Sequence, residues 1–352
     1  MTVFYITLLS VYIFSLLARV IRVKNKNIAL IFVIIVILIL TLVSGLRSGI
    51  GDTDMYIHLY SLVGPGYDSN GGYEAGFVFF LEVLKRFSEE PQFMIMVTSI
   101  IINILNVISM YIFTEDGYFE IAAFLYIASG YYTVTMNGIR QSLAGSILFI
   151  ATIFIIKKKF ILYLITCLLM MTFHNSAFVM IPMYFIVREK AWHKKVNILY
   201  CLMLVGLFLY DPLMQMLQGS KYGAYSDFNE GGANPIRIAI FLVPIFLSYI
   251  KRDVIREKWN NGDIFVNMTT VCGIIMLFSA LNWIFARFTI YFQPYTFIVF
   301  SFLLKNCFKS KEKRLIYFGF IVCYFLFFYY DQVIALGMQY PTNFNINEFL
   351  FY

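Results

Sequence analysis

Long apolar runs, separated by short polar segments, follow one another along almost the whole chain. Many hold about twenty residues, which is enough for a helix to cross the ~30 Å hydrocarbon core of a bilayer. Residues 28–46, IALIFVIIVILILTLVSGL, are the clearest example. The pattern predicts an all-α polytopic membrane protein with about twelve helices. The expected spans are residues 3–21, 28–46, 92–113, 118–135, 138–156, 196–217, 235–250, 264–286, 288–304 and 315–331.

Composition agrees with this class. The chain of 352 residues is 61% hydrophobic and 13% charged, and its mean hydropathy is +0.77. A soluble domain would carry about a quarter charged residues. The first run lacks a basic start and a small-residue cleavage site, so we expect a retained span and not a signal peptide. We expect residues 1–352 to form a single transmembrane domain.

Basic residues gather in five clusters that set the topology. They lie at residues 19–26, 157–159, 188–195, 251–258 and 305–314. The positive-inside rule places all five in the cytoplasm and the N-terminus outside. Residues 160–187 have a basic cluster on each side, and each half is too short for a full crossing. We therefore expect a re-entrant-like hairpin of two short helices that meet at FHNS, residues 173–176.

The remaining polar groups converge on the outer side in this topology. Outer segments include a loop and amphipathic helix within residues 47–90, with the helix at 73–87, and a loop at residues 218–235. Several separate parts of the chain deliver a cation, a carboxylate or an imidazole to that layer. The members considered as site residues are Arg47, Asp52, Asp54, Glu74, Arg140, His174 and Arg287.

Two arginines are candidates for binding an anionic ligand. Arg140 opens a span beside the polar Gln141, although an arginine at the interface can also simply extend its charge toward water. Arg287 shares a helix face with Tyr291 and has almost no other charge near it in sequence. A charge close to the hydrocarbon needs a partner or water. The alternative is an internal salt bridge from Arg287 to Asp52 or Asp54.

His174 lies at the expected hairpin tip, where a pKa near neutrality suits proton transfer. A packing or hydrogen-bonding role is the alternative for this residue. Asp52, Thr53 and Asp54 form a DxD sequence that can hold a divalent cation against a diphosphate, although three residues are a weak signal. Asp52 could equally cap the helix that starts near Asp54.

Other motifs carry less information about function. The five cysteines lie in or beside apolar runs without metal-binding spacing, so we expect buried free thiols. No phosphate-binding or dinucleotide-binding glycine motif is present in the sequence, and neither ATP, NAD nor nucleic acid is expected as a ligand.

Four short motifs, taken in order, resemble the EpsG family of polysaccharide polymerases. RSGIGDTDMYIHLY resembles the family's RxGxGxDxxxY, YEAGF its YExGF, GIRQ its GxRQ and TFHNSAF its FHxSA. The single late arginine, Arg287, also has a counterpart there. The resemblance runs from about residue 1 to 330. It implies a Wzy-type polymerase with a GT-C-like helical bundle in the bacterial inner membrane, with its active site on the outer, periplasmic face.

The resemblance also implies substrates and residue roles. Such enzymes join polyprenyl-diphosphate-linked oligosaccharide repeat units into O-antigen, capsule or exopolysaccharide, and a chain-length regulator and a flippase are possible partners beside membrane lipid. Guanidinium groups match phosphate oxygens. The expected diphosphate-binding residues are Arg47, Arg140, Gln141 and Arg287. The expected catalytic residues are His174, Asp54 and Glu74, and the expected sugar-binding residues are Asp52, Tyr56 and Tyr291. No cofactor is expected, although a divalent cation at Asp52 and Asp54 stays open.

Two other functions fit parts of the pattern. One is a GT-C-type glycosyltransferase that uses the DxD sequence with a metal ion. The other is a flippase or transporter of lipid-linked sugars, which would require charged residues to continue through the bundle toward the cytoplasm. The spans show little such charge.

Overall fold

The predicted spans form helices in the computed structural model, which describes residues 1–64, 67, 72–209 and 231–342. No strand occurs in these ranges. Within the described part of the chain, five helical segments are long and apolar enough to cross a membrane: Thr2–Arg22, Lys26–Gly45, Pro91–Phe113, Ile139–Ile156 and Lys311–Ala335. The all-α polytopic prediction is therefore confirmed. The expected outer loop at residues 218–235 lies mostly outside the described residues.

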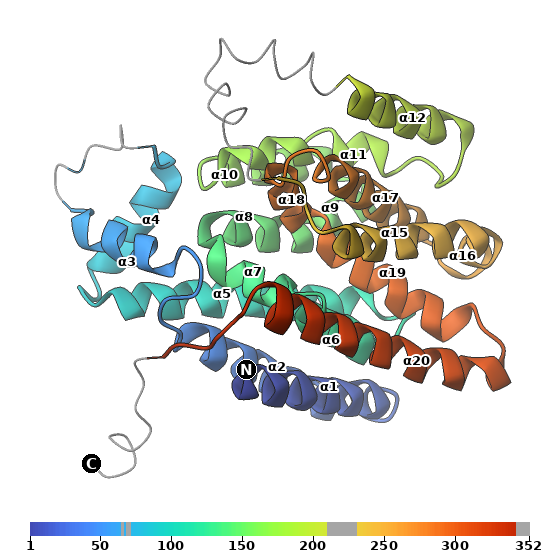
Figure 1. The fold of residues 1–352 in the computed structure, drawn as a ribbon, viewed down its shortest axis with the longest axis horizontal. Helices are drawn as coiled ribbons and strands as arrows, with labels where there is room; N and C mark the ends of the chain where they lie inside the picture. Colours follow the sequence, from blue (N-terminus) through green and yellow to red (C-terminus); the bar gives the residue numbers. More distant parts are fainter. Residues whose placement is uncertain (65–66, 68–71, 210–230, 343–352) are drawn as a thin grey trace.

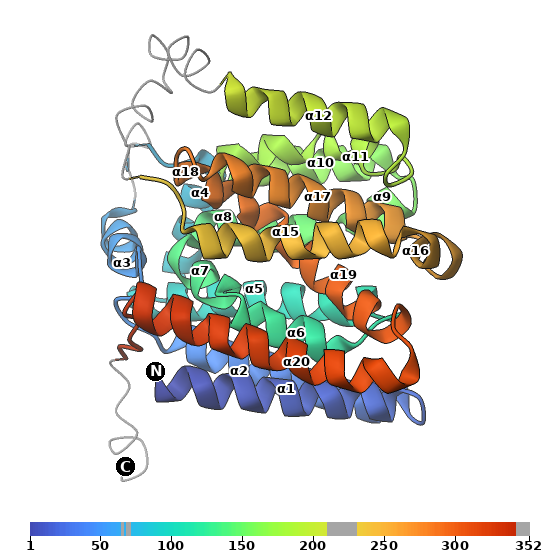
Figure 2. The ribbon, with the colours of Figure 1, turned by 45° about the vertical axis from the view of Figure 1, so that its right-hand side comes forward.

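The helices run side by side and form one bundle (Figures 1 and 2). At one edge, α1 (Thr2–Arg22) and α2 (Lys26–Gly45) pack as a hairpin against α5 (Pro91–Phe113) and α6 (Phe119–Ala128). At the other, α17 (Gly262–Phe278) packs against α15 (Pro235–Ile250), α12 (Lys194–Phe208) and α19 (Gln293–Asn306). Between them lies α8 (Ile139–Ile150), continued by α9 (Thr152–Ile156).

All five basic clusters lie at one end of this bundle. In Figure 2 that end is on the right, where α1 turns into α2, α11 (Met183–Ile186) leads to α12, and α19 leads to α20 (Ser310–Phe328). The short helix α16 (Arg252–Lys258) lies at the same end. The chain thus separates its cationic turns from the opposite end, where α3 (Thr53–Leu62) lies.

The expected hairpin at residues 160–187 is confirmed. Helix α10 (Phe160–Met171) leads away from the basic end, and η2 (Asn175–Met180) and α11 return to it. The two arms pack together, and the hydroxyl of Tyr163 donates a hydrogen bond of 3.0 Å to the carbonyl oxygen of Met180. The tip at residues 172–174 lies next to α4 (Ala75–Lys85), because the amide N–H of Phe77 donates to the carbonyl oxygen of Thr172.

Two predicted spans are broken near the end of the bundle that is away from the basic clusters. The expected span 118–135 divides into α6 and α7 (Tyr131–Asn137) at Gly130, whose φ of 79° lies in the left-handed region that glycine tolerates best. The expected span 264–286 ends as α17 at Phe278, and α18 (Ile284–Phe288) and η3 (Thr289–Tyr291) follow. Non-helical backbone within a membrane-spanning bundle is tolerated where it is buried in protein or lines a polar cavity.

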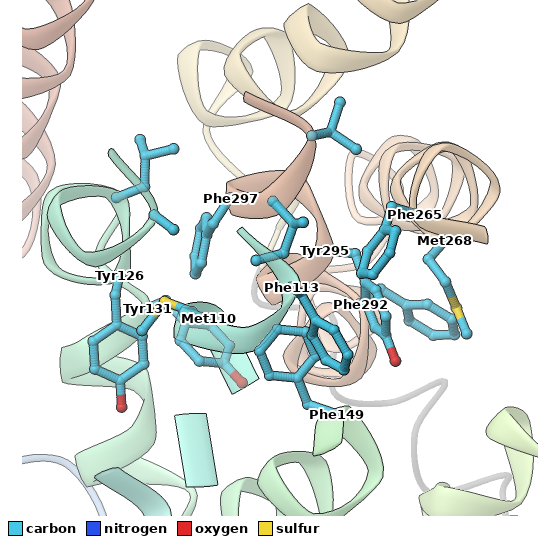
Figure 3. Packing of buried hydrophobic residues seen from close by; sticks show 14 of the residues in the cluster. Met110, Phe113, Tyr126, Tyr131, Phe149, Phe265, Met268, Phe292, Tyr295 and Phe297 are labelled. Carbon is cyan, nitrogen blue, oxygen red and sulfur yellow. The ribbon is translucent and has the colours of Figure 1, made fainter. Parts of the chain in front are cut away.

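An aromatic core holds α5, α8, α17 and α19 together (Figure 3). The ring of Phe113 lies 5.5 Å from that of Phe149 and 5.3 Å from that of Phe265, centroid to centroid. The ring of Tyr295 lies 5.2 Å from that of Phe149, and its hydroxyl is within 2.7 Å of the hydroxyl of Thr152. The pairs Phe113–Phe149 and Phe149–Tyr295 are edge-to-face, and pairs of this kind favour one fixed arrangement of the helices.

The cysteine prediction is partly wrong. All five thiols are free, and Cys167, Cys272 and Cys307 are buried, but Cys201 and Cys323 are exposed on the outer surface of the bundle. Both exposed thiols lie on helices, α12 and α20, whose neighbouring side chains include exposed leucine, valine and phenylalanine. A surface that faces lipid can carry such a thiol as a small apolar group, so sequence context alone did not separate core from lipid contact.

Candidate functional site

A polar cleft of about 590 Å³ opens at the end of the bundle away from the basic clusters. Its walls come from α3, α7, the start of α8, the hairpin tip, α15, α18 with η3, and the π-helix η4 (Tyr329–Ala335) that continues α20. Three arginines, one histidine and one aspartate are among the residues that line it: Asp52, Arg140, His174, Arg237 and Arg287. The breaks in the helices described above supply much of this lining.

Arg140 is paired with Glu74. One Nη atom of Arg140 donates to one carboxylate oxygen of Glu74, and the other oxygen accepts the backbone N–H of Asn175 at 2.9 Å. Glu74 therefore joins the start of α4, the start of α8 and the hairpin tip. Both of its oxygens are engaged, and Glu74 is not among the residues that line the cleft.

The Arg140 guanidinium lies in an aromatic and polar setting. It lies 4.8 Å from the centroid of the Tyr73 ring, and its buried Nε atom has no hydrogen-bond partner among the residues that the structure describes. Burial raises the pKa of the buried Tyr56 hydroxyl, and the positive charge of Arg140 opposes that rise. Arg140 and Tyr56 both line the cleft. The arginine thus keeps donor capacity after its pairing with Glu74.

Arg287 is exposed to the cleft without an acidic partner among the described residues. Its guanidinium lies 4.8 Å from the centroid of the Trp283 ring, and no carboxylate of the described chain lies within ion-pair distance. The alternative of an internal salt bridge to Asp52 or Asp54 is therefore not formed. Gln141 supports this turn, because its side-chain N–H donates to the carbonyl oxygen of Arg287 at 2.9 Å.

His174 heads a chain of hydroxyl contacts. Its Nδ1 lies 2.6 Å from the Oγ of Ser176, which lies 2.9 Å from the hydroxyl of Tyr291. The side-chain N–H of Gln141 also approaches Ser176, at 3.4 Å. Burial, opposed by the charge of Glu74 and aided by Arg140 and Arg287, lowers the pKa of His174 to about 4. The imidazole is therefore neutral near pH 7, and the contact to Ser176 fixes the orientation of its ring.

The two aspartates of the DxD sequence differ in position. Asp52 lines the cleft, whereas Asp54 is exposed and is not among the lining residues. Asp52 precedes the first residue of α3, but its side chain makes no capping hydrogen bond. In the described part of the chain no group of three or more histidine, cysteine or acidic side chains could hold a metal ion. The two carboxylates are thus not brought together in the cleft.

Arg47 lies outside the cleft, buried in the protein, with only 2% of its surface exposed. It donates hydrogen bonds to the carbonyl oxygens of Ser44 and Met136 and to the hydroxyls of Ser99 and Thr53. These partners belong to α2, α7, α5 and α3. Burial lowers the pKa of Arg47 to about 10, so the group stays charged near pH 7. Its contacts join four helices and do not face a ligand.

Arg237, Ser176 and the end of α20 were assigned no role from the sequence. Arg237 lines the cleft, and its Nη2 and Nε lie 2.6 Å and 3.1 Å from the same oxygen of the buried Asp331. The other oxygen of Asp331 accepts the side-chain N–H of Gln332 at 2.6 Å. A buried acid inside the last apolar run was a signal that the sequence did offer.

The fold and the cleft together define a polytopic helical membrane protein with a cationic pocket at the end opposite its basic turns. The chain belongs to the EpsG family, whose model matches residues 30–342. Membership supports a polysaccharide polymerase-like function of the glycosyltransferase type in general, with lipid-linked oligosaccharides as substrates. Neither the curated proteins nor the solved structures contain a match to this chain. The likeness to a GT-C bundle therefore stays a prediction.

Proposed function

We propose that the protein polymerises polyprenyl-diphosphate-linked oligosaccharide repeat units on the outer face of the bacterial inner membrane. The observation that carries the proposal is the meeting of Arg140, Arg287 and His174 in one cleft, supplied by α8, α18 and the hairpin tip. An anionic leaving group and a hydroxyl nucleophile need cations and a base at one place. The cleft lies away from the basic end of the bundle, which the positive-inside rule assigns to the cytoplasm.

The reaction transfers a glycan from one lipid to another. A hydroxyl oxygen of the acceptor sugar forms a bond to the anomeric carbon of the donor, and the bond from that carbon to the diphosphate oxygen breaks. The electron pair leaves with the polyprenyl diphosphate, and the hydroxyl proton passes to a base. Arg287 has no acidic partner in the described chain and is the first candidate for meeting the departing charge. Arg140 adds a second guanidinium, and a preorganised donor of this kind is worth about 3–4 kcal/mol.

His174 is the base that this geometry favours among the three candidates. It is neutral near pH 7 and lines the cleft. Glu74 already accepts hydrogen bonds from Arg140 and Asn175 with its two oxygens, and Asp54 is exposed outside the cleft. A bound diphosphate would bring negative charge close to the imidazole, raise its pKa and so strengthen it as a base in the complex.

The remaining residues contribute to orientation. We assign Asp52 and Tyr56, which line the cleft, to hydroxyl groups of the sugars. Tyr291 is 1% exposed and contacts Ser176, so it positions His174 through that hydroxyl and does not itself bind sugar. Gln141 positions Arg287, because its side-chain N–H donates a hydrogen bond to the backbone carbonyl oxygen of Arg287. Arg47 is assigned to the fold. We propose two partners for this reaction: a flippase that supplies the lipid substrate and a regulator of chain length.

Elongation by the purified protein tests the proposal. In proteoliposomes that contain the purified protein and lipids that each carry a single repeat unit, we expect a ladder of longer lipid-linked glycans. No ladder, together with movement of the lipid-linked glycan across the bilayer, would instead support the transporter. A chelator tests the DxD metal enzyme, since loss of the ladder on chelation and its return with a divalent cation would favour that alternative.

A further inference from the structure

A narrow apolar crevice lies next to the polar cleft, among the helices α15, α19 and α20. Its lining residues include Phe241 and Pro244 of α15, Phe297 and Phe300 of α19, and Tyr324 of α20. The crevice shares Ser129, Phe241 and Gln293 with the cleft, so the two spaces lie on either side of these side chains. Its free volume is only about 10 Å³, so it is closed in this structure.

The crevice follows from how the helices pack. Helix α15 packs against α17 and α19, whereas α20 packs against α6 and α19. Helix α19 thus forms the base of a furrow between α15 and α20, and Figure 2 shows these two helices on the same face of the bundle with α19 behind them. Both helices also carry exposed apolar side chains that do not line the crevice, such as Phe246 on α15 and Phe325 on α20. Lipid would contact these side chains on the outer surface of the bundle.

Two polar contacts close the furrow where it meets the cleft. One is the ion pair of Arg237 and Asp331, and the other is the hydrogen bond of 2.8 Å that the side-chain amide of Asn234 donates to the hydroxyl of Tyr330. Each joins the start of α15 to η4, a π-helical segment. π-Helical segments are rare in proteins, and those that do occur are frequently found at functional sites.

We propose that the prenyl chain of a lipid diphosphate occupies this crevice, having entered from the bilayer between α15 and α20, and that the Arg237–Asp331 pair is the latch of that opening. The inference rests on the proposed function. A lipid diphosphate must keep its headgroup among the cleft cations and its tail in apolar surroundings, and the crevice is an apolar space that adjoins the cleft through three shared lining residues.

The chemistry of the latch matches this ligand. Arg237 lines the cleft with a side chain that is 29% exposed, while the side chain of Asp331 is 3% exposed. An arriving diphosphate offers the guanidinium more negative charge than one carboxylate does, so it competes with Asp331 for Arg237. That competition weakens the tie between α15 and η4 when the headgroup is at the cleft.

Photo-crosslinking tests where the tail lies. We would place p-benzoylphenylalanine at Phe241 in the crevice, or at Phe246 on the lipid-facing side of the same helix as the matched control. The probe is a fluorescent polyprenyl diphosphate in vesicles of phosphatidylethanolamine and phosphatidylglycerol. Labelling at Phe241 should saturate and be lost when excess unlabelled polyprenyl diphosphate is added, whereas labelling at Phe246 should do neither. If the substitution at Phe241 prevents folding, a second pair on α20 replaces the first, with p-benzoylphenylalanine at Tyr324 as the test position and at Phe325 as the control.

Two results would overturn the assignment. One is labelling at Phe241 and Tyr324 no stronger than at their controls. The other is equal competition by a polyprenol without the diphosphate, because the head would then not hold the tail in place. Photo-crosslinking measures the binding of the lipid and does not measure elongation of the glycan chain. Saturable labelling without a glycan ladder would refute the polymerase function and still support the crevice as the site of the prenyl chain. A glycan ladder without labelling would support the polymerase function and refute the crevice as that site.

The latch has its own variant. Asp331→Asn keeps the size of the side chain and removes the charge that holds Arg237, so labelling at Phe241 should begin several-fold faster. Asn234→Ala, which removes the second tie, should act in the same direction. Asp253→Asn, at the exposed basic end, is the control and should change nothing. Unchanged labelling rates in the first two variants would exclude a latch.

Discussion

Three arginines that look alike in the sequence have different surroundings in the structure. Arg47 gives its donors to four protein groups, and Arg140 shares its charge with Glu74. Arg287 faces the cleft with its guanidinium 4.8 Å from the centroid of the Trp283 ring and forms no ion pair within the described chain. A residue whose hydrogen-bonding capacity is fully used by the protein stabilises the fold, and one that is left unsatisfied is available to a ligand. These surroundings give each arginine its own expected mutant behaviour.

Arg287→Lys should lower the rate of chain elongation by about 100-fold while the protein stays folded, because an ammonium keeps the charge but loses the planar fork. The rate is measured from the glycan ladder in proteoliposomes. Arg314→Lys, an exposed change at the basic end, is the matched control. A wild-type rate in Arg287→Lys would remove this residue from diphosphate binding, and Arg140→Lys would then carry the test alone.

Arg47→Gln should act on stability. The carbonyl oxygens of Ser44 and Met136 would each lose a charged donor, and a buried polar group left unpaired costs about 1–3 kcal/mol. We expect a lower thermal unfolding temperature in detergent. A variant that is as stable as the native chain but inactive would return Arg47 to the ligand-binding set.

His174 gives a pH dependence with a defined sign. Its pKa is lowered to about 4, chiefly by burial, so the neutral imidazole that serves as base is already present at every pH above about 5. The kcat/KM for elongation, which reports the free protein, should stay level from pH 7 to about pH 5 and fall as pH drops through about 4. His174→Ala should abolish the reaction without unfolding the protein. A fall centred near the ordinary histidine value of 6.5 would contradict this environment.

At the scale of elements, the site depends on helices that stop early. The chain could have continued from α6 into α7 as one span, but Gly130 turns it there. A Cβ atom at this position would lie 2.7 Å from Nε2 of Gln332 and 3.2 Å from an oxygen of Asp331. The break between α6 and α7 and the docking of η4 are therefore parts of one arrangement.

Gly130→Ala should destabilise the protein by at least about 1–2 kcal/mol, because an L-residue disfavours the left-handed backbone and its Cβ displaces Gln332. Displacement also breaks the 2.9 Å hydrogen bond from Thr133 to Gln332. Thermal unfolding in detergent measures the loss. Gly319→Ala, a helical position with nothing within 4 Å of the added atom, is the control and should not lower stability. Equal stability of the two variants would show that η4 does not need this close approach.

At the scale of the whole molecule, the basic turns and the cleft lie at opposite ends of one bundle. If the positive-inside rule holds, the hairpin tip faces the outside of the cell. A cysteine at Asn175, which is exposed at the tip, should react with a membrane-impermeant thiol reagent added to intact cells. A cysteine at Lys159, at the base of the same hairpin, should react only after the membrane is opened. The reverse pattern would place the cleft in the cytoplasm and refute an outer-face polymerase.

The sequence by itself determined the membrane class, the approximate ranges of most spans, the hairpin and the common end of the basic clusters. Hydrophobic runs and charge clusters are local properties, and the bilayer acts on them span by span. It also supplied the family motifs and, among the residues that line the cleft, Asp52, Tyr56, Arg140, Gln141, His174 and Arg287.

Only the tertiary structure decided which of these polar groups face a ligand. The burial of Arg47, the outward position of Asp54 and the pairing of Arg237 with Asp331 depend on partners 50 to 90 or more residues away in the chain or on how a loop turns. A local pattern places a residue on a helix or at its end, but the hydrogen bonds left for a substrate are those that distant neighbours have not already taken.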